Sequence, residues 1–125
     1  MKFFLCEHCG NIVEMVRDVG VPVYCCGEPM KELSANTSDG ASEKHVPVVR
    51  REDGALIVEL GSTAHPMNDD HLMEWVVVET EHGCLRRDLH PGDDTTLKFL
   101  VCDCDKPLAV YAYCNLHGLW MTRVS

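Results

Sequence analysis

The amino-acid sequence predicts a mainly β protein in two parts, a small metal-stapled module followed by a β-sandwich or β-barrel. Four of the eight cysteines lie near the start, between Cys6 and Cys26. Beyond them, short apolar runs alternate with turn residues, and no long segment carries the 3.6-residue apolar period of a helix. The 125 residues, 46% of them hydrophobic, suffice for a compact domain with a small module attached.

The N-terminal module is expected to contain two short strands, at 12–16 and 21–24, around a turn at 18–20. Chains below about 40 residues usually need a metal or disulfides to fold, because they bury too little apolar surface. The small polar residues from Ser34 to Ser42 indicate a linker or long loop. We therefore place the domains at 1–36 and 37–125.

The second domain is expected to be almost entirely strand. Turn signals at 52–54, 81–83, 91–94 and 103–107 separate its apolar runs. Such spacing is typical of a sandwich or barrel. The predicted strands are 46–50, 56–60, 75–80, 96–104, 108–114 and 119–124.

Charge and composition exclude several classes of protein. Twenty acidic residues against eleven basic ones give a net charge of −9, which argues against nucleic acid or an anionic membrane as partner. No apolar run approaches the ~20 residues of a membrane span. The segment from Met1 to Cys6 lacks the length of a secretory signal, so we expect a cytoplasmic protein. Cysteines in that reducing compartment indicate metal binding rather than disulfides.

The first candidate metal site consists of Cys6, Cys9, Cys25 and Cys26. Two pairs of thiolates can close a tetrahedron around iron or zinc. The second pair is adjacent rather than separated by two residues, so we expect a distorted tetrahedron. The spacing alone leaves a structural zinc and a redox-active iron equally open.

The second candidate site gathers four histidines and one cysteine: His45, His65, His71, Cys114 and His117. A single histidine is usually a surface residue, but these lie beside turns and strand ends. Cys114 ends an alternating strand and His117 follows in a tight turn, so both side chains can meet one ion. Four imidazoles and one thiolate suit Fe(II), and five donors leave one position of a six-coordinate ion for a substrate.

Both sites lie within motifs that resemble a known family. The segments CEHCGNIVE and CCGEPM resemble the desulforedoxin module across about residues 3–33. The segments EKHVP, AHPM and CNLHGLW resemble the catalytic domain of superoxide reductases, the neelaredoxin module, across about residues 38–124. A chain that carries both modules is similar to the desulfoferrodoxins, or two-iron superoxide reductases.

The resemblance implies an immunoglobulin-like β-barrel and two non-haem irons per chain. One iron would be bound by Cys6, Cys9, Cys25 and Cys26, where zinc is also possible. The other would be bound by His45, His65, His71 and His117, with Cys114 as the axial ligand. The implied activity is the one-electron reduction of superoxide to hydrogen peroxide, which detoxifies superoxide. A homodimer and a rubredoxin-type electron donor are also implied.

The resemblance further assigns catalytic roles to Glu43 and Lys44. Glu43 would bind the oxidised iron, and Lys44 would guide superoxide or organise water for protonation. Gly40, Ala41 and Ser42 suggest that both residues lie in a mobile loop. The alternative for this pair is two solvated charges.

Two other functions remain as alternatives, namely dismutase activity at the same site and a non-catalytic zinc-binding or iron-binding module. The resemblance gives no role to Cys84, Cys102 and Cys104. We expect these three to be buried thiols or redox-sensitive surface thiols.

Overall fold

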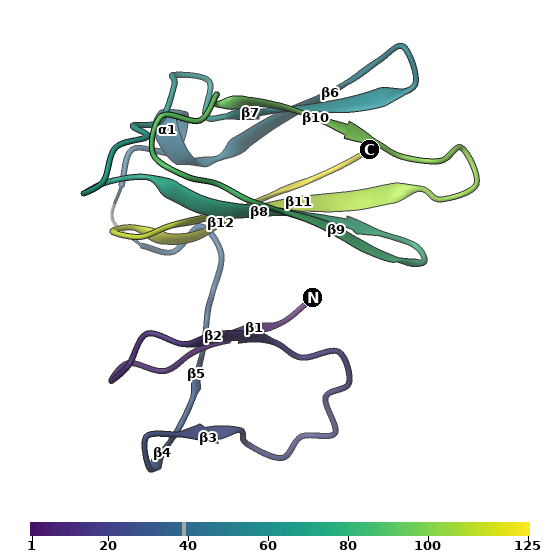
Figure 1. Cartoon of the computed structure of the whole chain (residues 1–125). Coiled ribbons are helices and arrows are strands. Elements are labelled where there is room, and N and C mark those ends of the chain that lie inside the picture. The colour runs from purple at the N-terminus through teal and green to yellow at the C-terminus, as the bar shows by residue number, and fades with distance from the viewer. Residues whose placement is uncertain (39) are drawn as a thin grey trace. The chain divides into compact units, whose positions relative to one another are not determined.

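The computed structural model describes residues 1–38 and 40–125, so Asp39, within the expected linker, lies outside the described residues. The chain forms two compact units, Met1–Ser34 and Ala35–Ser125. Nearly all regular structure is strand, which confirms the predicted mainly β class (Figure 1). The described residues contain one helix, α1 (Ser42–His45), which is far too short to cross a bilayer.

The N-terminal unit is a three-stranded sheet with a short two-stranded ribbon. Its strands are β1 (Phe3–Leu5), β2 (Ile12–Glu14), β3 (Tyr24–Cys25), β4 (Glu28–Pro29) and β5 (Lys31–Glu32). Strand β1 lies between β2 and β5, and β3 pairs with β4. Its buried hydrophobic residues are Phe3, Cys6 and Met30. So small a core leaves the module dependent on other sources of stability.

One predicted strand of this unit is wrong. The expected strand at 12–16 is observed as the shorter β2, but of 21–24 only Tyr24 belongs to a strand. Val21 is 67% exposed. Pro22 offers no backbone N–H to a neighbouring strand. The apolar composition of this run therefore reflects exposed side chains and not a half-buried strand.

The C-terminal unit packs two antiparallel sheets face to face (Figure 1). One sheet has the order β10-β7-β6, with β6 (Pro47–Glu52), β7 (Ala55–Leu60) and β10 (Thr96–Leu100). The other has the order β12-β11-β8-β9, with β8 (Met73–Thr80), β9 (Gly83–Asp88), β11 (Pro107–Cys114) and β12 (Gly118–Arg123). Fully buried residues of both sheets, among them Leu56, Val58, Val76 and Val110, form the core.

The predicted strands of this unit are all found, with two differences. The expected strand 96–104 ends at Leu100, because the chain turns at 103–104. Strand β9 was not predicted, since all six of its residues are exposed and no apolar alternation marks it. Between β6 and β7, Asp53 and Gly54 have φ of 49° and 77°, as a tight hairpin turn requires.

Candidate metal centres

The four N-terminal cysteines converge on one point. Their sulfur atoms all lie within 4.8 Å of one another. Cys6 follows β1, where its carbonyl accepts a hydrogen bond from the Gly10 N–H (2.9 Å), which closes a tight turn around Cys9. Cys25 ends β3, so the two halves of the site come from two turns. A cluster of four thiols at this spacing fits a tetrahedral iron or zinc ion.

The backbone of Cys26 explains how two adjacent cysteines can face the same centre. Consecutive side chains of a strand point to opposite faces. Cys26 leaves β3 with a φ of 53°, a left-handed conformation that is unusual for a residue other than glycine. This turn brings the Cys26 sulfur to the same side as that of Cys25. The distortion expected from adjacent cysteines is thus taken up in the backbone.

The four thiols cannot all ionise without a cation. The backbone N–H of Cys9 lowers the pKa of Cys6 to about 6, since it stabilises the thiolate. The pKa of Cys26 is instead raised to about 12, chiefly by its hydrogen bond to Cys6. One thiolate therefore holds its neighbour protonated, and a bound metal ion would replace the shared protons.

The second centre lies at one end of the sandwich, where several elements begin or end. Ligand atoms of His45, His65, His71 and Cys114 lie within 4.8 Å of one another. His117 Nδ1 lies 3.1 Å from His45 Nε2 and 3.7 Å from Cys114 Sγ. Helix α1 supplies His45, and the segment between β7 and β8 supplies His65 and His71. The last residue of β11 supplies Cys114, and the β11–β12 turn supplies His117.

The four imidazole rings form a closed cycle in the order 45, 65, 71, 117. Neighbouring ring centroids are 4.6 to 5.1 Å apart, whereas His45 and His71, across the cycle, are 6.2 Å apart. These distances are those of a rough square. Four imidazoles in this arrangement can surround one metal ion.

Hydrogen bonds fix which ring nitrogens face the centre. His45 Nδ1 lies 2.7 Å from the Ala41 carbonyl, and His65 Nδ1 lies 2.6 Å from that of Pro66. A carbonyl oxygen only accepts, so each Nδ1 carries the proton and each Nε2 keeps a lone pair. His65 Nε2 and His71 Nε2 are buried and have no hydrogen-bond partner. Buried polar atoms left unsatisfied are rare, and a metal ion would satisfy both.

Burial sets the protonation of this centre. It lowers the pKa of His65 to about 4 and also lowers the pKa of His45 and of His71. These imidazoles are therefore neutral near pH 7, the form that binds metals. Burial raises the pKa of the Cys114 thiol, and the N–H groups of Leu116 and His117 partly oppose this effect. A cation in the centre would favour the thiolate.

Two residues that the sequence analysis did not assign to the site hold it in place. Asn115 accepts a hydrogen bond from the Leu72 N–H (3.0 Å) and donates one to the Asp70 carbonyl (2.9 Å), which joins the His71 segment to the Cys114 turn. Trp120 stacks on His45 at 4.8 Å and donates from Nε1 to the His117 carbonyl at 3.1 Å. The sequence signal that could have identified Asn115 and Trp120 is their position in the segment CNLHGLW, which also contains the donors Cys114 and His117.

Glu43 and Lys44 lie in helix α1 and not in the expected loop. The Glu43 carbonyl accepts hydrogen bonds from the Thr63 N–H (2.7 Å) and the Ser62 hydroxyl (3.3 Å). Gly61, with a φ of 85°, packs so closely that an added Cβ would lie 2.5 Å from the Lys44 carbonyl carbon. Both side chains are exposed. The charge of Lys44 contributes, after burial and the neighbouring histidines, to lowering the pKa of His45 and His71.

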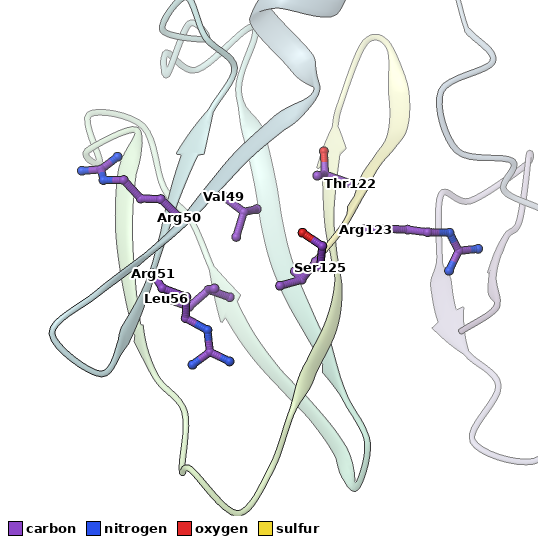
Figure 2. Close-up of a pocket in the computed structure, with 8 residues that line it drawn as sticks. Val49, Arg50, Arg51, Leu56, Thr122, Arg123 and Ser125 are labelled. Atoms are coloured by element: carbon purple, nitrogen blue, oxygen red, sulfur yellow. The ribbon is translucent and has the colours of Figure 1, made fainter.

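The three arginines that line one pocket of the sandwich do not converge on a common point. A pocket of about 260 Å³ is lined by Arg50, Arg51 and Arg123, among other residues. Figure 2 shows these three side chains pointing in different directions. Arg50 is also neutralised by Glu59 (2.5 Å) and Glu52 (3.3 Å). Lys44 is thus better placed than these residues to act on the histidine centre.

Comparison with known proteins gives consistent matches along the chain. The family model described as desulfoferrodoxin matches residues 37–123, and that of the desulfoferrodoxin N-terminal domain matches residues 1–33. A desulfoferrodoxin homologue from Archaeoglobus fulgidus is 44% identical over 123 residues, covering 98% of this chain and 96% of the relative. A desulfoferrodoxin from Nitratidesulfovibrio vulgaris is 44% identical over 119 residues, covering 95% and 93%.

Solved structures of superoxide reductases also align with this chain. The superoxide reductase from Treponema pallidum aligns with a TM-score of 0.81 at 33% identity and covers 97% of each chain. The one-iron superoxide reductase from Giardia intestinalis aligns with a TM-score of 0.53 at 30% identity, covering 66% of this chain and 98% of that one.

Proposed function

Because the chain belongs to the desulfoferrodoxin family, we propose that it is a superoxide reductase, an oxidoreductase that converts superoxide into hydrogen peroxide. Each turnover takes one superoxide, one electron and two protons and yields one hydrogen peroxide. The observation that carries this proposal is the convergence of four imidazoles and the Cys114 thiol on one point, with two buried nitrogens lacking partners. This donor set and the four-cysteine cluster fit two iron centres.

The charge of the histidine centre supports an anionic substrate. Iron bound there supplies the electron that superoxide receives. The neutral imidazoles add no charge and the Cys114 thiolate adds one negative charge, so a ferrous centre keeps about one positive charge. Local positive charge is needed, because the whole chain carries −9 and repels anions.

We assign supporting roles to the two charged residues of helix α1. Lys44 adds positive charge beside His45 and His71, which attracts superoxide and can orient a water molecule for proton delivery. Glu43 is the carboxylate that would bind the oxidised centre. Its backbone is fixed by Ser62 and Thr63, so any approach to the centre is a movement of its side chain alone.

The four-cysteine centre would receive electrons from a donor of the rubredoxin type and hold iron, with zinc as a possible substitute. Its exposed Cys9 and Cys26 are suited to electron transfer with a partner. We further propose a cytoplasmic homodimer with domains 1–36 and 37–125. The two family matches, which end at 33 and begin at 37, support this boundary.

The stoichiometry of the reaction tests the proposed function. Anaerobically purified, iron-loaded protein is supplied with a reductant and pulses of superoxide, and hydrogen peroxide and oxygen are measured. We expect one peroxide for each superoxide and no oxygen. Oxygen release equal to half the superoxide consumed would instead establish a dismutase. Zinc in both centres, with no superoxide consumption, would establish a non-catalytic metal-binding module.

A further inference from the structure

Three cysteines of the C-terminal unit belong to neither metal centre. The structure joins Cys102 and Cys104 in a disulfide, with their Cα atoms 5.1 Å apart, and Cys84 lies nearby on β9. All three are exposed, so of the two expected alternatives the buried thiols are excluded and the surface thiols remain. Within residues 1–38 and 40–125, the only converging groups of potential metal ligands are the two centres already described. Cys102 and Cys104 therefore belong to neither of these candidate metal sites.

The turn that carries Cys102 and Cys104 is held against the β8–β9 hairpin. The Asp105 N–H donates to the Cys102 carbonyl (2.9 Å). The Asp105 carboxylate accepts hydrogen bonds from the Thr80 hydroxyl (2.8 Å) and the His82 N–H (3.1 Å). Cys84 and Cys102 consequently line the same pocket, of about 330 Å³. A fixed turn keeps the two sulfurs of Cys102 and Cys104 close after the disulfide is reduced.

This group lies at the opposite end of the sandwich from the histidine centre. Strand β11 begins at Pro107, just after the turn, and ends at the metal donor Cys114 (Figure 1). Its eight residues span roughly 23 Å at a rise of ~3.3 Å per residue. A reaction at Cys102 and Cys104 therefore takes place far from the donors of the histidine centre.

We propose that Cys102 and Cys104 form a peroxide-oxidisable dithiol site, separate from both metal centres. The inference rests on the proposed function only for its oxidant, since hydrogen peroxide is the product of that reaction. One thiolate attacks the O–O bond and becomes a sulfenic acid as the first water leaves. The second thiol displaces the second water and closes the disulfide. Two thiols are oxidised, and one peroxide is reduced to two waters.

The surroundings favour Cys102 as the attacking residue. The Cys104 N–H lies 3.2 Å from Cys102 Sγ, and a backbone N–H aimed at sulfur stabilises a thiolate. Cys104, two residues further on, is in position to resolve the sulfenic acid before further oxidation.

Thiol mapping after direct addition of peroxide tests the proposal. Iron-loaded protein is reduced with dithiothreitol, freed of reductant, exposed to hydrogen peroxide under anaerobic conditions, and alkylated for peptide mass spectrometry. We expect the peptide that contains Cys102 and Cys104 to lose both alkylation sites, become lighter by two hydrogens, and recover with dithiothreitol. Cys102→Ser and Cys104→Ser should each abolish this change. Cys84→Ser is the matched control and should retain it.

Three results would overturn the proposal. The first is full alkylation of Cys102 and Cys104 after peroxide treatment. The second is a disulfide that links two chains, seen on a non-reducing gel. The third is loss of the disulfide in Cys84→Ser, which would mean that Cys84 is a member of the reacting pair. Because peroxide is added directly, none of these results depends on superoxide reduction, which is measured separately in the same variants.

Discussion

The two metal centres differ in how they relate to the fold around them. The four-cysteine centre is built from two turns close in sequence, and two of its four sulfurs belong to exposed residues. The histidine centre draws donors from residue 45 to residue 117, and His45, His65 and Cys114 are at most 3% exposed. The first unit buries few apolar residues, whereas the second has a fourteen-residue core cluster. The cysteine centre therefore holds its module together, while the sandwich holds the histidine centre.

Removal of both metals gives the largest expected difference between the two units. Under reducing conditions with a chelator, residues 1–34 should lose their protection against amide hydrogen exchange. Structural zinc in small domains contributes about 10 kcal/mol or more to folding, and the small core of this unit cannot replace such a contribution. Strands β7, β8 and β11 of the same sample serve as the control and should stay protected. Persistent protection of residues 1–34 would show that the module folds without its metal.

A matched pair of cysteine substitutions separates the centres in the metal-loaded protein. Cys114→Ser removes the one sulfur donor of the histidine centre, and superoxide reduction should fall more than about 100-fold, because even outer-shell changes cost roughly 10–100-fold. Its sulfur-to-iron absorption band should also disappear. Cys6→Ser should remove only the band of the four-cysteine centre and leave superoxide reduction with an artificial reductant largely unchanged. Loss of both bands in either variant would show that the donors were divided wrongly between the centres.

The same contrast explains how much the sequence could predict. Strands such as β7, β8 and β11 were predictable because they supply the buried apolar residues of the core. Strand β9 was not, since its residues are all exposed and its place depends on pairing with β8. The apolar run at 21–24 was wrongly predicted as a strand, because its apolar residues on both sides of Pro22 are exposed. Apolar residues in the sequence predict a strand correctly where that strand is buried. The prediction fails where a strand is exposed and held by pairing, or where an apolar run is exposed.

The candidate sites follow the same rule. Spacing pointed to Cys6 and Cys9, and the tight turn after the predicted strand placed His117 beside Cys114, because these are local relations. The left-handed turn at Cys26 has no sequence signal, because a residue other than glycine rarely adopts it. The hydrogen bonds of Asn115 to Leu72 and Asp70 join segments that are far apart in the sequence. Helix α1 was missed because four residues carry no periodic signal. The sequence analysis therefore named the donors but not the contacts that orient them.

Acid should destabilise the metal-free sandwich through the histidine centre. Burial lowers the pKa of His65 to about 4 from its ordinary 6.5, so the unfolded chain binds this proton at higher pH than the folded one. The contribution of His65 to the free energy of unfolding is therefore fully present above about pH 6.5, and it is lost as the pH falls toward 4. His65 alone corresponds to a loss on the order of 3 kcal/mol. Urea titrations across this pH range measure the effect.

The control for the acid effect is a histidine outside the centre. His65→Gln should flatten the dependence of unfolding free energy on pH between about 6.5 and 4. His90→Gln, at a side chain that is 77% exposed, should leave that dependence unchanged. Equal slopes in all three proteins would exclude His65 as the source of acid sensitivity.

Asn115 gives a smaller effect, confined to the histidine centre. Asn115→Ala removes the hydrogen bonds that join the His71 segment to the Cys114 turn, and iron affinity of this centre should fall about tenfold. The four-cysteine centre should keep its affinity. Asn36→Ala is the matched control, because Asn36 also makes two side-chain bonds to the backbone, both to Met121. It should lower stability without lowering iron affinity, and a similar loss of affinity in both variants would remove the special role of Asn115.

The smallest expected effect concerns the charges of helix α1. The reduced enzyme is mixed with pulse-generated superoxide at several ionic strengths. Lys44→Ala should slow the encounter about threefold at low salt, because the local attraction that opposes the net charge of −9 is lost. Its salt dependence should weaken or invert, since salt then screens repulsion rather than attraction. Arg50→Ala removes an equal charge that Glu59 and Glu52 already neutralise, and should keep the parent rate and slope.

Glu43→Ala completes this test, because its neighbouring charge has a different proposed role. The carboxylate would bind only the oxidised centre, so the encounter of superoxide with the reduced enzyme should change little. The absorption spectrum of the oxidised resting enzyme should shift instead.

A Lys44→Ala enzyme with the parent rate and salt slope would assign the attraction to the metal's own charge. An unchanged oxidised spectrum in Glu43→Ala would show that Glu43 is a solvated residue, since Ser62 and Thr63 bond only to its backbone.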